Sequence, residues 1–190
     1  MPRMNLGKTT VVRAAAELVN TEGWEQLSLG KLATKLRVQP PSLYNHINGL
    51  PGLARELRLL STREQGECMA RAAIGQSGPQ AVRRVAQAYR EYIKSNLGVY
   101  LMGVRSSALQ SPVDAELEAA QAEILQTGIA VLAAFELSEA ETLHALRGLR
   151  SLIHGFATLE AAGGFGLPVD CDESFWRLTE MFINELSSRE

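Results

Sequence analysis

The apolar positions of this chain recur at helical spacing over most of its length. The usual spacing is i, i+3, i+4 and i+7, which lines apolar side chains along one face of a helix. No alternating pattern typical of strands is present, and no repeat or low-complexity tract interrupts the chain. Breaks fall at glycine and proline, as at Gly98 and in the linker Gly75–Pro79. Ser138 and Glu141 predict a capping box at the start of one long helix, and Asp172 is expected to cap the last helix. The pattern predicts an all-α fold of about nine helices.

The most informative stretch is Ser28–Ile47, which predicts two short helices joined by a tight turn. Ser28 precedes the first apolar stripe and suits an N-cap, because its hydroxyl can accept from a free backbone N–H. Pro40 and Pro41 fit only the first turn of the second helix, where a missing N–H costs nothing. The side chains expected to hold the pair together are Leu29, Leu32, Ala33, Leu36, Leu43 and Ile47.

The second of these helices leaves short or planar hydrogen-bonding groups on its outer face, and none of them is acidic. Such groups suit base edges and phosphate oxygens. In a helix-turn-helix, the second helix enters the major groove with its N-terminal residues foremost. A helical hairpin with a polar face would give the same pattern, and that alternative stays open here. The outward set is Gln39, Ser42, Tyr44, Asn45 and His46.

Residues 8–57 resemble the N-terminal DNA-binding domain of the tetracycline-repressor (TetR) family of transcriptional regulators. The most specific matching segment is Val38–Ile47, which contains a Leu-Tyr-x-His signature near its end. The end of the first helix, Asn20–Trp24, also matches. One position departs from the family: Leu50 stands where a phosphate-binding lysine is common, so that contact is not expected here.

The resemblance implies a three-helix DNA-binding domain over residues 1–50, with the helix-turn-helix at 28–47, and a larger helical effector-binding and dimerisation domain over 51–190. It implies a homodimeric repressor that leaves a palindromic operator in double-stranded DNA when a small-molecule effector binds. We expect base contacts from Gln39, Ser42 and Asn45. The remaining DNA-binding candidates, which we expect mainly at phosphates, are Ser28, Lys35, Pro41, Tyr44 and His46.

The second domain resembles one C-terminal type of the family, which carries a Trp-His-Gly pattern in its penultimate helix. His154-Gly155 matches that pattern, although no tryptophan precedes it. A ligand cavity is implied by the resemblance alone, and no motif marks it. The candidates for its lining are Tyr89, Tyr92, Tyr100, Arg105, Leu125, His154 and Phe156.

Each effector candidate has a plainer alternative. Apolar and aromatic residues at helical spacing equally fit an ordinary core. His154 could donate to an effector or be a satisfied core histidine. Arg105 stands in an apolar segment, where burial would require an anionic partner. That partner could be Glu160, Glu123 or an acidic effector.

In the family, the last two long helices pair with those of a second copy. Here the first of these helices carries one apolar stripe, and the last carries an apolar arc wider than one face needs. The symmetry of helix-turn-helix regulators, which read two half-sites, favours a dimer. The alternative is that the whole arc faces the core of the same chain. The predicted interface residues are Leu149, Ile153, Phe175, Trp176 and Phe182.

Charge divides the chain unevenly. Residues 1–60 carry a net charge of +4 and residues 61–190 carry −6, for −2 in total. A basic head on an acidic body is typical of a small nucleic-acid-binding module on a larger domain. No run of 18 apolar residues and no apolar signal segment is present, which predicts a cytoplasmic protein without membrane association. Cys68 and Cys171 form no motif and are expected to be free thiols.

No catalytic or cofactor motif is found in the sequence, which has no HExxH, CxxC, GxSxG or phosphate-binding loop. His144 and His154 are ten residues apart and would differ by roughly 80° in direction on a helix, which does not make a metal pair. We expect no enzyme, no cofactor and no metal. The alternative to a regulator is an all-helical small-molecule-binding or catalytic protein that does not bind DNA.

Overall fold

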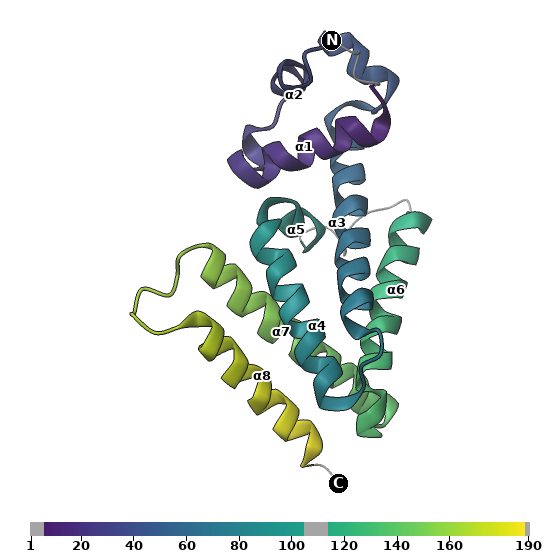
Figure 1. The fold of residues 1–190 in the computed structure, drawn as a ribbon. Helices are drawn as coiled ribbons and strands as arrows, with labels where there is room; N and C mark the ends of the chain where they lie inside the picture. The colour runs from purple at the N-terminus through teal and green to yellow at the C-terminus, as the bar shows by residue number, and fades with distance from the viewer. Residues whose placement is uncertain (1–5, 105–113, 189–190) are drawn as a thin grey trace. The chain divides into compact units, whose positions relative to one another are not determined.

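The computed structural model describes residues 6–104 and 114–188, and all regular structure in these residues is helical. Together with the 3-10 helix Pro40–Asn45 (η2), the eight α-helices of the described residues make the nine that the sequence predicts (Figure 1). No helix in the described part of the chain is long and apolar enough to cross a membrane. The α-helices are α1 Lys8–Glu22, α2 Leu29–Leu36, α3 Gly49–Ala73, α4 Gly78–Ser95, α5 Leu97–Val104, α6 Ala115–Leu132, α7 Glu139–Ala161 and α8 Cys171–Ser187.

The chain forms two compact units. The first contains residues 1–62 and 96–117, and the second contains residues 63–95 and 118–190. Helix α3 is continuous from the first unit into the second. The first unit takes in α5, which follows α4 by one residue. The domain boundary between residues 50 and 51 stays a prediction.

The core of the first unit is built from the apolar stripes of α1, α2, η2, the first half of α3, and α5. Trp24 packs against this core from the short 3-10 helix Trp24–Gln26, as expected for a residue that follows the end of α1. Burial of such stripes is the main source of stability for short helices, which are marginal alone. The fully buried residues at its centre include Val11, Ala15, Leu32, Leu43, Leu53 and Leu57.

Helix α5 packs closely against α1. Asn20 near the end of α1 accepts a hydrogen bond from the backbone N–H of Val99 (3.0 Å) and donates one to the side chain of Asn96 (3.3 Å). Gly98 lies against the backbone of Val19 and Asn20. The sequence predicted that Gly98 interrupts the helix, whereas the structure places it inside α5 at the point of closest approach.

An ion network joins α1, α3 and the start of α6 within the first unit. Arg55 binds both carboxylate oxygens of Asp114, with distances of 2.7 and 2.8 Å, and also contacts Glu116 at 2.6 Å. Glu56 accepts from Arg55 at 2.8 Å and pairs with Lys8 of α1 at 2.7 Å. The guanidinium group of Arg55 is therefore bound by carboxylates of the same chain.

This network makes the stability of the first unit depend on pH. The hydrogen bonds from Arg55 lower the pKa of Asp114 from 3.8 to about 2, so the folded state favours its carboxylate. The stabilisation is complete above about pH 4 and is lost as pH falls toward 2. In urea unfolding, we expect Asp114→Asn to cost about 1 kcal/mol at pH 6 after solvent screening, and much less near pH 2. An equal cost at both pH values would contradict this assignment.

In the second unit, α4 packs against α7 and α8 (Figure 1). Helix α7 begins at the predicted capping box, in which Ser138 and Glu141 each accept from the backbone N–H of the other. Helix α8 differs from the prediction that Asp172 caps it. Asp170 is the N-cap and accepts from Asp172 N (2.6 Å) and Glu173 N (3.0 Å), while the Asp172 side chain contacts Arg90.

Candidate nucleic-acid interface

Helix α2 begins and ends at residues that fix the turn leading to η2. Ser28 is extended (φ −137°), and its Oγ accepts from Lys31 N at 3.2 Å, which confirms the predicted cap. Arg37 adopts the left-handed conformation (φ 56°), and its N–H donates to Thr34 O at 3.1 Å. The N–H of Val38 donates to Ala33 O at 3.0 Å. These bonds satisfy the carbonyls of Ala33 and Thr34 in the last turn of α2 and end the helix.

The second element of the motif is a 3-10 helix, which the apolar pattern alone did not distinguish from an α-helix. Pro40 and Pro41 remove two consecutive N–H groups, so Ser42 is the first donor and bonds to Gln39 O at 2.9 Å. The N–H of His46 bonds to Leu43 O at 2.9 Å, which continues the i to i+3 pattern. Leu43 is fully buried and anchors this element to the core.

The structure brings six of the DNA-binding candidates together on η2 and the residues beside it. Tyr44 is 61% exposed although the adjacent Leu43 is buried. Gln39, Pro41 and Asn45 are exposed, and Ser42 and His46 are half-buried. Polar and aromatic groups at the surface of an element whose apolar residues are buried can contact a ligand without unfolding the motif.

The two candidates on the preceding helix, Ser28 and Lys35, are also exposed. The Ser28 hydroxyl accepts the capping bond and can still donate its own hydrogen. Lys35 pairs with Glu17 at 2.8 Å. A surface pair of this kind contributes little, about 1 kcal/mol or less, so a phosphate can compete with Glu17 for the ammonium group.

Residues 82–182 match the family model described as "Tetracyclin repressor-like, C-terminal domain". Over 188 residues, the chain is 35% identical to the HTH-type transcriptional regulator YobS of Bacillus subtilis, covering 97% of this chain and 95% of that protein. The chain belongs to the TetR family. It is therefore a transcriptional regulator with an HTH motif. The match to the Trp-His-Gly type of C-terminal domain stays a prediction.

Two further comparisons agree with this assignment. The tetracycline repressor of class A from transposon 1721 in Escherichia coli is 29% identical over 126 residues, which cover 63% of this chain and 53% of that protein. Among solved structures, TetR from Acinetobacter baumannii AYE superposes with a TM-score of 0.71 at 21% identity, covering 97% of this chain and 98% of that one. This structural similarity confirms the TetR fold.

The effector candidates of this TetR-family chain differ in their surroundings. Tyr89 and Tyr92 of α4 are buried in the second unit, and Tyr100 of α5 is buried in the first. Leu125 of α6 is 43% exposed, and Phe156 of α7 is half-buried. Arg105 lies outside the described residues.

His154 is half-buried on α7 and differs chemically from the other candidates. Burial lowers its pKa below the ordinary histidine value, and the positive charge of Arg150 lowers it further. The imidazole is therefore neutral at pH 7 and can both donate and accept a hydrogen bond.

The predicted dimer residues divide into two groups. Leu149, Ile153 and Phe175 are buried within a single chain. This burial fits a place in the chain's own core, and their contact with a second copy stays a prediction. Trp176 is 53% exposed and Phe182 is half-buried, so both still present apolar surface.

Sequence reasoning missed Arg90, a buried arginine on α4. Glu160, considered as a partner for Arg105, binds the Arg90 guanidinium through both of its oxygens at 2.7 Å. The sequence did carry a signal. Arg90 lies four residues after Ala86 and three before Ile93, on the apolar stripe of α4, where an arginine requires an acidic partner.

Proposed function

We propose that this TetR-family regulator is a homodimeric repressor that binds a palindromic operator and leaves it when a small molecule binds the second unit. The observation that carries the DNA-binding part is the recognition element itself. Leu43 is buried and fixes η2, while Tyr44 and its polar neighbours are exposed. Two copies related by a twofold axis would present two such elements to successive major grooves.

Each candidate side chain has a role in this proposal. The side chains of Gln39, Ser42 and Asn45 have the donors and acceptors that read base edges. The hydroxyls of Ser28 and Tyr44, the ammonium of Lys35 and the imidazole of His46 suit phosphates. Pro41 contributes an apolar contact at the front of the element.

Release by a small molecule is supported by the relatives. A variant of TetR from Acinetobacter baumannii AYE was solved in complex with minocycline, and it superposes on this chain with a TM-score of 0.69 at 24% identity. By analogy, we propose an effector site among the candidates Tyr89, Tyr92, Leu125, His154 and Phe156 of the second unit. An effector shifts the equilibrium only by the difference between its affinities for the DNA-binding and released conformations.

The proposal is tested by selecting DNA fragments from a random pool with the purified protein and sequencing them. We expect an inverted repeat, bound with an affinity that falls steeply as salt rises, because phosphate neutralisation releases counterions. A scrambled repeat of equal length is the matched control. Recovery of no enriched sequence at moderate salt would contradict the proposal and favour an all-helical protein without DNA binding.

A further inference from the structure

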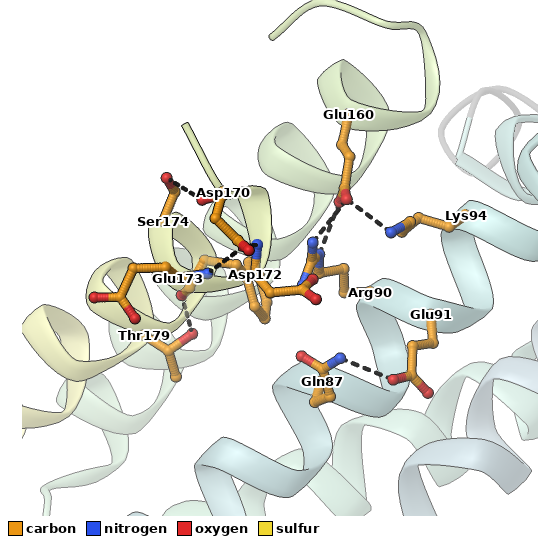
Figure 2. Close-up of polar contacts among 11 residues, drawn as sticks. Gln87, Arg90, Glu91, Lys94, Glu160, Asp170, Asp172, Glu173, Ser174 and Thr179 are labelled. Atoms are coloured by element: carbon orange, nitrogen blue, oxygen red, sulfur yellow. Dashed lines mark hydrogen bonds and ion pairs between the residues drawn. The ribbon is translucent and has the colours of Figure 1, made fainter. Parts of the chain in front are cut away.

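Arg90 of α4 is only 1% exposed, yet its side chain carries a full positive charge. Its Nε and Nη2 donate to the two oxygens of Glu160, each at 2.7 Å, and its Nη1 lies 2.8 Å from Asp172 Oδ1 (Figure 2). All three guanidinium nitrogens therefore have a carboxylate partner. Burying an arginine is costly unless its donors are satisfied in this way.

Helices α7 and α8 each supply one carboxylate and one aromatic ring to this arginine. From α7 come Phe156 and Glu160, one helical turn apart, and from α8 come Asp172 and Phe175. The centre of the guanidinium lies 5.4 Å from the Phe156 ring centroid and 4.8 Å from that of Phe175. Both distances suit a cation–π contact. We call these five residues the Arg90 clasp.

A second cation completes the charge balance. Lys94, one turn further along α4, binds Glu160 Oε1 at 2.7 Å (Figure 2). The hydrogen bonds from Arg90, together with that from Lys94, hold the pKa of Glu160 below its usual value. Arg90 and Lys94 thus face Glu160 and Asp172, two positive charges against two negative ones. Together with Lys94, the clasp is neutral overall and joins three helices.

The loop between α7 and α8 does not fix how these helices pair. Its residues 162–170 are all exposed. The backbone hydrogen bonds at its ends are local, as between Gly164 N and Leu159 O at 2.7 Å and between Val169 N and Leu167 O at 2.8 Å. A glycine-containing exposed loop permits many geometries. The pairing of α7 and α8 therefore depends on contacts between the helices themselves, and the clasp is one of these, because it ties both helices to α4.

Helices α7 and α8 each carry a large exposed apolar side chain next in sequence to a residue of the clasp. Leu159 precedes Glu160 on α7, and Trp176 follows Phe175 on α8, and both apolar side chains are 53% exposed. Successive helical residues point roughly 100° apart, so a side chain fixed inward also fixes the direction of its neighbour. The clasp thereby determines where Leu159 and Trp176 lie on the surface of the second unit.

We propose that the Arg90 clasp positions Leu159 and Trp176 for contact with a second copy of this chain, which makes Arg90 a positioning residue for dimerisation. This inference rests on the proposed homodimer and adds a residue that is itself buried away from the partner. The fork geometry of arginine is essential to it. Lysine at this position would keep the charge but lose the bidentate pair and the stacking on the rings.

The test compares Arg90→Lys with Arg83→Lys, measuring the dimer dissociation constant of the full chain by sedimentation equilibrium. Arg83 is a matched control on the same helix, because it also binds both oxygens of one carboxylate, Glu180 of α8, at 2.5 and 2.8 Å. The Arg83–Glu180 pair is more exposed than the Arg90–Glu160 pair of the clasp. We expect Arg90→Lys to weaken the dimer about tenfold or more and Arg83→Lys to leave it within about twofold.

Far-UV circular dichroism is recorded on each variant, so that dimer constants are compared only at temperatures where the helical content equals that of the wild type. Glu160→Gln is a second test of the clasp, since it keeps the volume of the side chain and removes its charge. Weakened dimers of both variants at unchanged helicity would support the inference. Dimer constants equal to that of the wild type would overturn it.

Three further outcomes are also decisive. If Arg90→Lys and Glu160→Gln both fail to fold while Arg83→Lys folds, the clasp serves the stability of the single chain and the inference is overturned. A wild-type chain that is monomeric would contradict the proposed homodimer and the inference with it. A wild-type dimer that binds its selected DNA, together with an unaffected Arg90→Lys dimer, would overturn the inference alone.

Discussion

Tyr44→Ala is expected to lower operator affinity by about 100-fold or more, below the range of an ordinary binding assay, while the fold and the dimer survive. The reason lies in two adjacent residues. Tyr44 is 61% exposed, so its side chain contributes little to the core, whereas the buried Leu43 fixes η2. Fluorescence anisotropy with the selected operator gives the affinity, and thermal unfolding monitors the fold.

Two companion variants sharpen this result. Tyr44→Phe removes only the hydroxyl, so a loss as large as that of Tyr44→Ala would assign the contact to a phosphate hydrogen bond. Leu43→Ala should instead unfold the motif, with a cost of about 2–5 kcal/mol typical of a buried leucine. If Tyr44→Ala unfolds the protein as Leu43→Ala does, the proposed contact role of Tyr44 is wrong.

Gly98→Ala is expected to destabilise the first unit by about 3 kcal/mol. An added Cβ would clash with Val19 O and would lie 2.7 Å from Val19 C and 3.0 Å from Asn20 Cα. All three are backbone atoms of α1, so no rotation of a side chain can relieve the overlap. Helix α5 would have to move away from α1 and give up the hydrogen bond from Val99 N to Asn20. Urea unfolding measures the loss.

The matched control is Gly155→Ala, also within a helix. No heavy atom lies within 4 Å of a Cβ added at Gly155, so alanine fits without displacement. Because alanine is the better helix former, this change should raise the free energy of unfolding by up to about 1 kcal/mol. Equal destabilisation by both substitutions would show that the contact between Gly98 and α1 does not account for the stability lost in Gly98→Ala.

Local chemistry made several elements predictable from the sequence. The Ser28 cap and the Ser138 capping box each depend on a side chain within three residues of the N–H that it accepts from. The buried positions of α2 follow from helical periodicity. The exposed residues of η2 could be named because the neighbouring leucine and isoleucine have to face inward.

The features that the sequence did not predict depend on distant partners. Asp170 and Asp172 are both good cap residues, but Asp170 caps α8, whereas the Asp172 carboxylate contacts Arg90, some 80 positions earlier in the chain. Gly98 looked like a break, because periodicity does not reveal that α1 lies against it. A wide apolar arc in the sequence likewise predicts that its residues are covered. It does not show whether the same chain or a second copy covers them. Phe175 lies in the core and its neighbour Trp176 at the surface, although both belong to the same apolar arc.

The 3-10 geometry of η2 limits how much sequence one copy of this protein can read. Six residues at about 2.0 Å rise extend about 12 Å, which spans only three or four base pairs of about 3.4 Å each. A word of that length recurs by chance on the order of once in a few hundred base pairs. Two such words at one fixed separation recur on the order of once in tens of thousands. In the proposed homodimer, a fixed separation between the two copies would therefore combine two short, common words into one rare site.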